Sequence, residues 1–285
     1  MAAQVLDGKA MAKRMRGELT QEFAKLKEQG HEAHLVSLSI GSDESSDWYV
    51  NNQKKQAEKL GVQYTAERIP ADSTFEQAAG KIREICGDAG VTGMILQLPV
   101  PKHIDGNELA KVITPEKNVE GVDPDNLGLI VMNQYRNIPC TARAAVELAA
   151  ESGIEFKGKR AVVLGRSIIV GKPCALLLLD KHCTVTVCHS RTENMAAIAS
   201  EADILVTAMG AKPGMVTGEF VKPGAVVVDV ATIATEDGKY KGDCDFDSVN
   251  EKAGWLSPVP GGVGSVTTQI LFKNTLETLR RLIAG

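Results

Sequence analysis

The sequence has neither a cysteine pair at metal-binding spacing nor a long apolar run. Six cysteines are scattered over 285 residues and none belongs to a CxxC pair, so they fit neither a disulfide framework nor a zinc site. No segment approaches the roughly 20 apolar residues of a membrane span, and the first stretch, MAAQVLDGKAMAKRM, has no apolar signal-peptide core. We therefore expect a cytoplasmic protein without a metal site and without membrane insertion.

Positive charge is also scarce. Lysine and arginine total 32 against 36 aspartates and glutamates, a net charge of −4, and no basic run stands out. This balance argues against nucleic-acid binding, which needs a basic surface. The five histidines have no metal-ligand spacing, and no Ser/His/Asp or Cys/His arrangement can be argued from the sequence. Metal catalysis and covalent catalysis are therefore poor interpretations.

The first half of the chain alternates between helical and strand-like segments. Apolar residues at helical spacing precede the strand-like stretch HLVSLSIG, and the alternation continues to the apolar strand GMILQL. This order predicts a parallel sheet covered by helices. The expected helices span residues 10–29, 46–60 and 75–86, and the expected strands span residues 34–41, 62–69 and 93–98.

The second half repeats the alternation after a loop region rich in Pro, Gly and Asp. A helix is expected from Thr141, and from Arg160 strands and helices follow in the order typical of a doubly wound dinucleotide-binding domain. The last helix, Thr267 to Ala284, has an apolar stripe suited to packing on the first domain. The predicted fold is α/β with two domains: an N-terminal α/β catalytic domain, residues 1–142 and 265–285, and a Rossmann-type doubly wound domain, residues 143–264.

A candidate phosphate-binding turn lies in RAVVLGRSIIVGKPCALLLL. An apolar strand ends at Gly165, Gly171 follows six residues later, and Pro173 can occupy the first turn of the next helix. Backbone N–H groups at such a helix start can hold a pyrophosphate. Ser167 replaces the second glycine of the GxGxxG pattern, so ordinary strand-to-helix geometry is the alternative, but the strand–helix–strand context favours a cofactor.

The next strand, TVTVCHSRT, indicates which nucleotide is bound. NAD-binding proteins usually place an acidic residue there, whereas this chain has Ser190 and Arg191, with Arg166 nearby in the phosphate turn. A hydroxyl and guanidinium groups suit a 2′-phosphate, which favours NADP. The alternative is that all three residues are solvated surface residues.

Three further stretches carry candidate ligand-binding groups. Gln97 lies near the carboxyl end of a buried strand, where open α/β sheets form crevices; alternatively its amide is satisfied internally. Most acids of PEKNVEGVDPDNLG are expected to be solvated, but Glu120 can accept N–H groups of a heterocycle. The glycine-rich turn from Pro260 to Ser265 either makes a tight turn or lets the backbone approach a flat ligand, and we favour the ligand.

The stretch YVNNQKK, residues 49–55, falls in an expected helix. A helix advances by about 100° per residue, so Tyr49 shares a face with Gln53 and Gln56. Lys54 and Lys55 then point away from that face to either side.

Seven separated stretches together resemble one known family. They are YVNNQKKQAEKLGV, GMILQLPVP, PEKNVEGV, PCTA, GRSIIVGKP, VTVCHSRT and SPVPGGVGSVTT. In order and spacing over essentially the whole chain, they resemble the bifunctional methylenetetrahydrofolate dehydrogenase/methenyltetrahydrofolate cyclohydrolase family. The resemblance implies one-carbon metabolism, a folate substrate, NADP, a catalytic cleft between the two domains and a homodimer formed through the cofactor domain.

The resemblance also implies roles for individual residues. Tyr49 would stack against the folate, Gln97 would position the catalytic lysine and a water, and Glu120 would bind the pterin ring. The remaining implied contacts are with the folate through the turn Pro260, Gly261, Gly262, Val263 and Gly264, and with NADP through Thr141, Gly165, Arg166, Ser167, Gly171, Ser190, Arg191 and Thr232.

The departures from the family pattern bear on the second reaction. The family expects a lysine four residues after the tyrosine, and this chain has Gln53. In the family that lysine assists hydrolysis of the methenyl cation, and an amide cannot exchange a proton near neutral pH. Other departures are Glu120 in place of aspartate, Ile168 in place of asparagine, Ser265 in place of proline and DVATI in place of DVGIN.

The sequence therefore predicts an NADP-dependent methylenetetrahydrofolate dehydrogenase with weak or absent cyclohydrolase activity. The close alternative is the full bifunctional enzyme, with Lys54 or Lys55 supplying the ammonium. A folate- and nucleotide-binding protein without turnover is a second alternative. A shikimate-type or amino-acid dehydrogenase is a third, weakened by the lack of a lysine–aspartate pair in the first domain.

Overall fold

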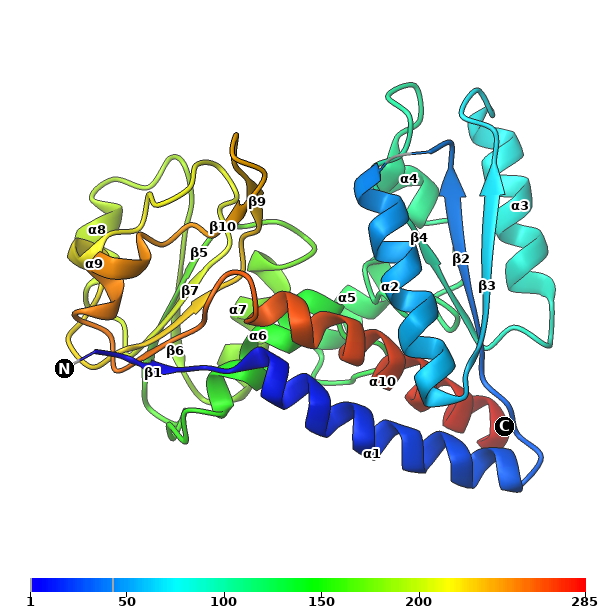
Figure 1. Cartoon of the computed structure of the whole chain (residues 1–285), viewed down its shortest axis with the longest axis horizontal. Helices are drawn as coiled ribbons and strands as arrows, with labels where there is room; N and C mark the ends of the chain where they lie inside the picture. Colours follow the sequence, from blue (N-terminus) through cyan, green and yellow to red (C-terminus); the bar gives the residue numbers. More distant parts are fainter. Residues whose placement is uncertain (1, 43) are drawn as a thin grey trace. The chain divides into compact units, whose positions relative to one another are not determined.

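The computed structural model describes residues 2–42 and 44–285, and it divides the chain into two compact units. Unit 1 comprises Met1–Arg14 and Pro139–Ile270, and unit 2 comprises Met15–Ile138 and Leu271–Gly285. Two of the boundaries between the units, after Arg14 and after Ile270, fall inside long helices. These helices are α1 (Gly8–Glu28) and α10 (Val263–Ala284). Each unit is therefore built from segments far apart in the sequence (Figure 1).

Unit 2 contains a three-stranded parallel sheet in the order β3-β2-β4. Helix α2 connects β2 to β3, and helix α3 connects β3 to β4 on the other side of β2 (Figure 1). The strand order therefore reverses between β2 and β4, which is where open sheets of this kind form a ligand crevice. The bounds are β2 His34–Ile40, α2 Glu44–Leu60, β3 Gln63–Ile69, α3 Phe75–Gly87 and β4 Gly93–Leu96.

The two faces of this sheet differ in polarity. Because side chains alternate along a strand, one face carries Val36, Leu38 and Ile40, which pack with Ile82 of α3 in a buried apolar cluster. The opposite face of the same strand carries Leu35 and two buried serines, Ser37 and Ser39. A parallel strand buried on both sides usually carries apolar residues throughout, so the buried serines mark this second face as a polar one.

The segment between the sheet of unit 2 and residue 138 contains two short helices. They are α4 (Gly106–Ala110) and α5 (Pro124–Val131), capped by the carboxylates of Asp105 and Asp123. Both fall in the region that the sequence predicted as loops. Five and eight residues among turn-forming residues carry too little periodicity to indicate a helix, although the aspartate before each helix is an N-cap signal.

Unit 1 contains a six-stranded sheet in which every pairing is parallel. The strand order reverses between β5 and β7, because β6 lies on one side of β5 and all later strands lie on the other. In spatial order the strands are β1 (Gln4–Val5), β11 (Trp255–Leu256), β8 (Val226–Asp229), β7 (Ile204–Thr207), β5 (Arg160–Leu164) and β6 (Thr184–Cys188).

Helices and a small hairpin complete unit 1. Buried aliphatic residues of the central strands, such as Leu164 and Val227, pack with α8 and α9 residues in one apolar cluster. The remaining elements are α6 (Cys140–Ala150), α7 (Gly171–Asp180), α8 (Met195–Ala199), η1 (Gly218–Phe220), α9 (Phe246–Asn250) and the antiparallel pair β9 (Ile233–Ala234) and β10 (Tyr240–Lys241).

The two-domain α/β fold with a doubly wound second sheet is confirmed, and the C-terminal part of α10 belongs to unit 2. Two details differ from the expectation. Residues 1–142 were assigned to the first domain, yet β1 pairs with β11 in the sheet of unit 1, because two extended residues before a helix give no periodic signal. The last helix begins at Val263 rather than Thr267, and Gly264 is its second residue.

Within residues 2–42 and 44–285, no helix is long and apolar enough to cross a membrane.

Candidate functional site

The turn after β5 brings two glycine-dependent backbone approaches together in unit 1. Gly165 has φ +128°, and a Cβ atom there would lie 2.3 Å from the carbonyl oxygen of Ala208, after β7. A Cβ atom on Gly171 would lie 2.3 Å from the carbonyl oxygen of Gly165. These contacts hold the end of β5, the end of β7 and the start of α7 at backbone distance, at the point where the strand order reverses. This is the geometry of a phosphate-binding turn.

Ser167 closes this turn from inside. Its hydroxyl accepts the N–H of Val170 at 3.1 Å and that of Gly171 at 3.4 Å, and its carbonyl accepts the N–H of Lys172 at 3.0 Å. The Ser167 side chain therefore fixes the conformation of the turn, at the position where the GxGxxG pattern has its second glycine. Arg166 and Ser167 are both exposed, so the residues that would face a pyrophosphate remain accessible.

The turn after β6 places Ser190 and Arg191 beside the phosphate turn, because β6 pairs with β5 along its whole length. The N–H of Arg191 donates to His189 Nδ1 at 3.1 Å, and the N–H of His189 donates to Thr192 Oγ1 at 2.9 Å. Ser190 and Arg191 are exposed, and no acidic residue ends this strand. The cations of Arg166 and Arg191 thus extend from neighbouring strand ends, as binding of a 2′-phosphate requires.

Two buried aspartates order the loops after β7 and β8, and the sequence reasoning did not identify them. Asp229, the last residue of β8, accepts Thr207 Oγ1 at 3.1 Å and the N–H groups of Asp243 and Cys244 at 3.1 and 2.8 Å. The carboxylate of Asp243 then accepts the N–H groups of Met209 and Gly210 at 2.7 and 2.9 Å. Burial raises the pKa of both carboxyls. The Asp243 carboxylate therefore fixes the backbone of the loop that contains Met209 and Gly210.

The other candidates in unit 1 are Thr141, Thr232 and the glycine-rich turn from Pro260 to Gly264. Thr141 is the second residue of α6, and Thr232 is exposed three residues after the end of β8. In the glycine-rich turn, a Cβ atom on Gly8 would lie 2.1 Å from the carbonyl oxygen of Gly262. A Cβ atom on Gly262 would lie 2.6 Å from the carbonyl oxygen of Pro258, so Gly262 is explained by a tight turn, whereas Pro260 and Gly264 are exposed. A contact of this turn with folate stays a prediction.

In unit 2, Gln53 and Gln97 meet at the carboxyl end of the small sheet. Gln97 follows β4 directly, and its Nε2 donates to Ser37 Oγ at 2.9 Å and to Gln53 Oε1 at 3.0 Å. The hydroxyl of Tyr64, on β3, donates to the same Gln53 oxygen at 2.9 Å. Only 6% of each glutamine is exposed. Ser37 and Tyr64 are diagonal neighbours on the polar face of the sheet, since Ser37 pairs with Ala66.

The other residues of YVNNQKK face differently. Tyr49 is 49% exposed, and its ring meets the ring of Trp48 edge to face, with centroids 5.2 Å apart. Lys54 and Lys55 are exposed on α2, on either side of the buried Gln53 position. The helical prediction for Gln53 and the two lysines therefore agrees with the structure, although Tyr49 lies at the outer margin of the shared face.

Glu120 lies in a loop held at both of its neighbours by buried asparagines. Asn274 Nδ2, from α10, donates to the carbonyl oxygens of Val119 at 2.8 Å and Ile138 at 2.9 Å, and the N–H of Gly121 donates to Asn118 Oδ1 at 3.2 Å. Burial raises the pKa of Glu120 to about 7. The backbone on both sides of Glu120 is therefore held in place, and burial favours the protonated form of its carboxyl.

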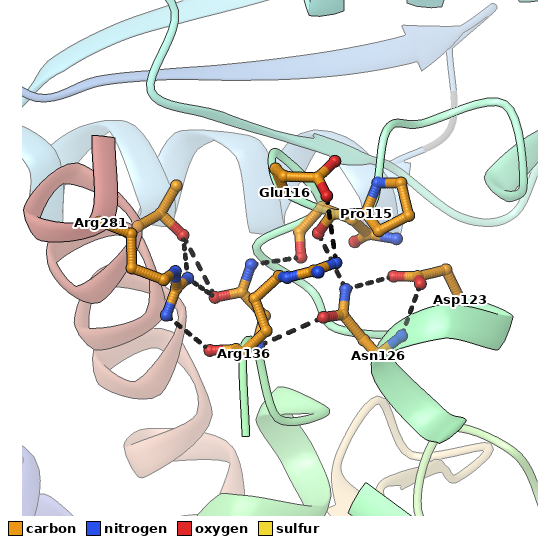
Figure 2. Close-up of polar contacts among 9 residues, drawn as sticks. Pro115, Glu116, Asp123, Asn126, Arg136 and Arg281 are labelled. Carbon is orange, nitrogen blue, oxygen red and sulfur yellow. Dashed lines mark hydrogen bonds and ion pairs between the residues drawn. The ribbon is translucent and has the colours of Figure 1, made fainter. Parts of the chain in front are cut away.

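Figure 2 shows how the loop is connected further to α5 and α10. Asn126 Nδ2 donates to the carbonyl oxygen of Pro115 at 2.9 Å and to Asp123 Oδ2 at 2.5 Å. Arg281 Nη1 donates to the carbonyl oxygen of Arg136 at 2.9 Å, and Arg136 forms an ion pair with Glu116 at 3.3 Å. The acid-rich loop is thus partly structural: Asp123 caps and clamps α5, and Glu116 binds an arginine.

Comparison with known proteins places these two groups of residues in one family. The sequence model of the tetrahydrofolate dehydrogenase/cyclohydrolase catalytic domain matches residues 6–120, and the model of the NAD(P)-binding domain of the same family matches residues 139–283. The chain belongs to the tetrahydrofolate dehydrogenase/cyclohydrolase family.

Individual members of the family match along their whole length. The bifunctional protein FolD of Moorella thermoacetica is 43% identical over 281 residues, which cover 99% of this chain and 100% of that protein. The FolD structure of Campylobacter jejuni superposes with a TM-score of 0.95 at 33% identity, covering 98% and 99% of the two chains. The Trypanosoma brucei FolD, solved with NADP and an inhibitor, superposes with a TM-score of 0.94 at 37% identity, covering both chains fully.

The family assignment agrees with the grouping of the candidates. Gly165, Arg166, Ser167 and Gly171 come together in the turn that belongs to the NAD(P)-binding domain, with Ser190 and Arg191 on the next strand. Gln53 and Gln97 come together in the catalytic domain, and Glu120 ends the segment that its model matches. Among the described residues, no cluster of three or more His, Cys, Asp or Glu side chains has metal-binding geometry.

Sequence reasoning missed Tyr64 and the Asp229–Asp243 pair. Tyr64 lies in a strand whose residues alternate without any turn or motif to single it out. A signal for the buried polar face was nevertheless present, because Ser37 and Ser39 alternate with aliphatic residues in HLVSLSI. Asp229 and Asp243 are 14 residues apart, and their meeting depends on the hairpin between them, which the sequence pattern did not indicate.

Proposed function

We propose that this chain is a methylenetetrahydrofolate dehydrogenase that uses NADP. The methylene carbon of the folate gives a hydride to the nicotinamide, which yields methenyltetrahydrofolate and NADPH. The observation that carries the proposal is the full-length match to one enzyme family together with an intact phosphate turn at the switch point of the unit 1 sheet. Hydride transfer needs the two small molecules held in contact, and the chemistry resides in them.

Residues of unit 1 support NADP as the cofactor. The exposed turn residues Arg166 and Ser167, between the end of β5 and the start of α7, are the candidates to face the pyrophosphate, and Arg166, Ser190 and Arg191 offer donors for the 2′-phosphate. When bound, the cofactor supplies the hydride acceptor. The chain's own contribution is to bind and orient it through these groups, with Thr141 and Thr232 as further candidate contacts.

Residues of unit 2 support a folate substrate. Tyr49 is 49% exposed and offers its ring for stacking, and the carboxyl of Glu120, in a loop held by Asn118 and Asn274, can accept paired N–H groups of the pterin. We further propose that Gln97 contacts the folate near its reacting carbon and that the turn Pro260 to Gly264 contributes to folate binding. The functional domains are proposed as residues 1–142 with 265–285 and residues 143–264.

We propose that hydrolysis of the methenyl product is slow in this protein. The residue at the position of the family lysine is Gln53, whose amide oxygen already accepts two hydrogen bonds from Tyr64 and Gln97. An amide cannot deliver or remove a proton at neutral pH. Because Lys54 and Lys55 are exposed beside the buried Gln53, neither ammonium occupies that position.

The bifunctional enzyme is a second candidate, and the comparisons favour it over a loss of the second activity. Relatives at 43% identity over their full length carry the name bifunctional protein FolD. In this candidate function the protein also produces formyltetrahydrofolate, with another group activating the water. A cytoplasmic homodimer fits either candidate, as does the absence of nucleic-acid and membrane partners.

One assay separates the candidates. Purified protein is mixed with methylenetetrahydrofolate and NADP, and NADPH, methenyl and formyl products are followed separately against buffer without protein. We expect NADPH formation and a methenyl product that decays at the buffer rate. Formyltetrahydrofolate at a protein-dependent rate would support the bifunctional candidate, and tight binding of both ligands without NADPH would indicate a binding protein.

If formyltetrahydrofolate forms, two variants locate the group responsible. Lys54→Ala and Lys55→Ala each remove one exposed ammonium from α2. A collapse of hydrolysis in either variant, with NADPH formation retained, would identify a relocated lysine. Unchanged hydrolysis in both would point to a group outside α2.

A further inference from the structure

The polar cluster around Gln53 consists of four side chains from the small sheet and α2, with three hydrogen bonds among them. Gln97 Nε2 donates to Ser37 Oγ and to Gln53 Oε1, and the Tyr64 hydroxyl donates to Gln53 Oε1. Ser37 also lies close enough to the Tyr64 hydroxyl to lower its pKa, against the larger effect of burial. The Tyr64 proton therefore has Gln53 as its acceptor, and the oxygen of Gln53 has two donors.

The two donors fix which end of the Gln53 amide is turned inward. If the amide were reversed, its NH₂ group would face the NH₂ group of Gln97 and the hydroxyl proton of Tyr64, and three donors would meet without an acceptor. In the observed orientation, neither Gln53 Nε2 nor Gln97 Oε1 has a hydrogen-bond partner among residues 2–42 and 47–285. The cluster therefore keeps one neutral donor and one neutral acceptor for a ligand, on two side chains that are each 94% buried, since 6% is exposed.

We propose that Tyr64 is a positioning residue that locks Gln53 as a neutral hydrogen-bond donor and thereby commits this site to hydride transfer. This inference rests on the proposed function and names the residue that sets its reaction specificity. Tyr64 acts through Gln53: its hydroxyl is the donor that, with Gln97, saturates the amide oxygen. Tyr64 also makes the site unsuited to an ammonium, because a lysine at position 53 would leave the Tyr64 proton without its acceptor.

The environment of Tyr64 fits this role. Burial raises the pKa of the phenol to about 12, with the Ser37 hydrogen bond opposing the rise, so the phenol stays protonated and keeps donating throughout the physiological range. The ring is held on the sheet face by its strand position, opposite Leu35. The four residues come from α2, β2, β3 and the end of β4, so the amide is fixed by regular elements rather than by a loop.

The first test removes the hydroxyl alone. In Tyr64→Phe, the Gln53 oxygen loses one of two donors and the amide gains freedom to rotate. We expect kcat/KM for methylenetetrahydrofolate to fall by roughly two- to tenfold, the range for one hydrogen bond, with KM for NADP unchanged and no gain of hydrolysis. Tyr240→Phe is the matched control, since Tyr240 is exposed on β10, and it should leave both activities unchanged.

The second test asks whether Tyr64 acts only through Gln53. Gln53→Met keeps the length of the side chain and removes the amide, so adding Tyr64→Phe to it should cause no further loss of dehydrogenase activity. Independent effects of the two substitutions, which multiply in the double variant, would overturn the positioning role. All variants are compared at equal folded fraction, measured by circular dichroism.

The third test concerns reaction specificity. Gln53→Lys should gain little cyclohydrolase activity alone, and Gln53→Lys combined with Tyr64→Phe should hydrolyse methenyltetrahydrofolate roughly tenfold faster than the single variant, because the unsatisfied hydroxyl is gone. Equal hydrolysis by the two variants would overturn the inference. Failure of the proposed function looks different: the unaltered protein would then form no NADPH, and the role of Tyr64 in specificity would fall with it.

Discussion

Gly165 and Ala208 approach each other so closely that a Cβ atom on Gly165 would lie 2.3 Å from the Ala208 carbonyl oxygen. Gly165 also has φ +128°, a conformation that side chains rarely adopt. Gly165→Ala should therefore combine backbone strain with a clash against backbone, and we expect a loss of roughly 2 to 4 kcal/mol in the free energy of unfolding of unit 1, with NADP binding reduced more than tenfold. Chemical denaturation and fluorescence titration measure the two effects.

Gly158→Ala separates strain from clash in the Gly165 experiment. Gly158 has φ +75°, and a Cβ atom there would meet nothing within 4 Å. It should cost about 1 kcal/mol and leave NADP affinity unchanged. If Gly165→Ala behaved like Gly158→Ala in both measurements, the close approach to Ala208 would not be what the cofactor turn needs.

Asp243 offers a prediction about the loop after β7. Its buried carboxylate holds the N–H groups of Met209 and Gly210, and Asp243→Asn replaces one acceptor oxygen with a donor that opposes them. We expect NADP binding to weaken by roughly ten- to a hundredfold, the range for charge-assisted hydrogen bonds, while folate binding is retained. Asp247→Asn, an exposed residue of α9, is the control and should bind NADP normally.

Arg191 gives a prediction about cofactor choice. Arg191→Ser removes one guanidinium at the end of β6, and the dissociation constant of NADP should rise by roughly tenfold or more, whereas that of NAD should not change. Each nucleotide serves as the control for the other in the same titration. A parallel loss for both nucleotides would show that Arg191 supports the turn and does not contact a 2′-phosphate.

Glu120 predicts a pH dependence of stability. The pKa is 4.5 in the reference state and about 7 in the folded protein because of burial. Between these values the folded state holds a proton that the unfolded state has lost, so the free energy of unfolding decreases as pH rises from 4.5 through 7. A difference of about 2.5 pKa units corresponds to at most about 3 kcal/mol, and solvent screening at this partly exposed side chain reduces it to the order of 1 kcal/mol.

Glu120→Gln removes this dependence. The melting temperature of the variant relative to the unaltered protein should rise between pH 5 and pH 8, since the variant avoids burying a carboxylate. In the unaltered protein, folate affinity should increase across pH 7 as the carboxyl ionises and accepts N–H groups. A melting-temperature difference independent of pH would contradict the raised pKa.

Asn274 predicts a link between the last helix and the folate-binding loop. Its amide donates to the carbonyl oxygens of Val119 and Ile138, and Asn274→Ala leaves both without this donor. We expect a destabilisation of roughly 2 to 4 kcal/mol and a higher KM for folate with an unchanged KM for NADP. Asn107→Ala, at an exposed position of α4, should cost less than about 0.5 kcal/mol.

The sequence predicted most of the fold because the pattern is regular. Strands such as Val226–Asp229 and helices such as Phe75–Gly87 carry the periodicity of their class, and the glycines of the phosphate turn stand where backbones must touch. The two-residue strands and the five-residue helices α4 and α9 were missed because they are too short to show a period. Their positions are set by tertiary pairing, as with β1 against β11.

The candidate site was predictable to the extent that chemistry follows from a motif. Gln97 was placed at a strand end by the apolar run before it, and its amide proves to be satisfied internally through Nε2 while Oε1 remains for a ligand. Tyr64 could not be found, because a partly buried tyrosine in an alternating strand is usually a packing residue. Tyr64 is important because its hydroxyl, on β3, donates to Gln53 on α2, and the sequence pattern does not indicate this contact.

The pairing of β1 with β11 also has a consequence for biosynthesis. The first strand of the chain cannot take its place until β11 has left the ribosome, because β11 lies between β1 and β8. Unit 2 waits as well, since Asn274 and Arg281 of α10 complete the loop that carries Glu120. Unit 1 therefore finishes folding only after β11 has been translated, and unit 2 only after α10 has been translated.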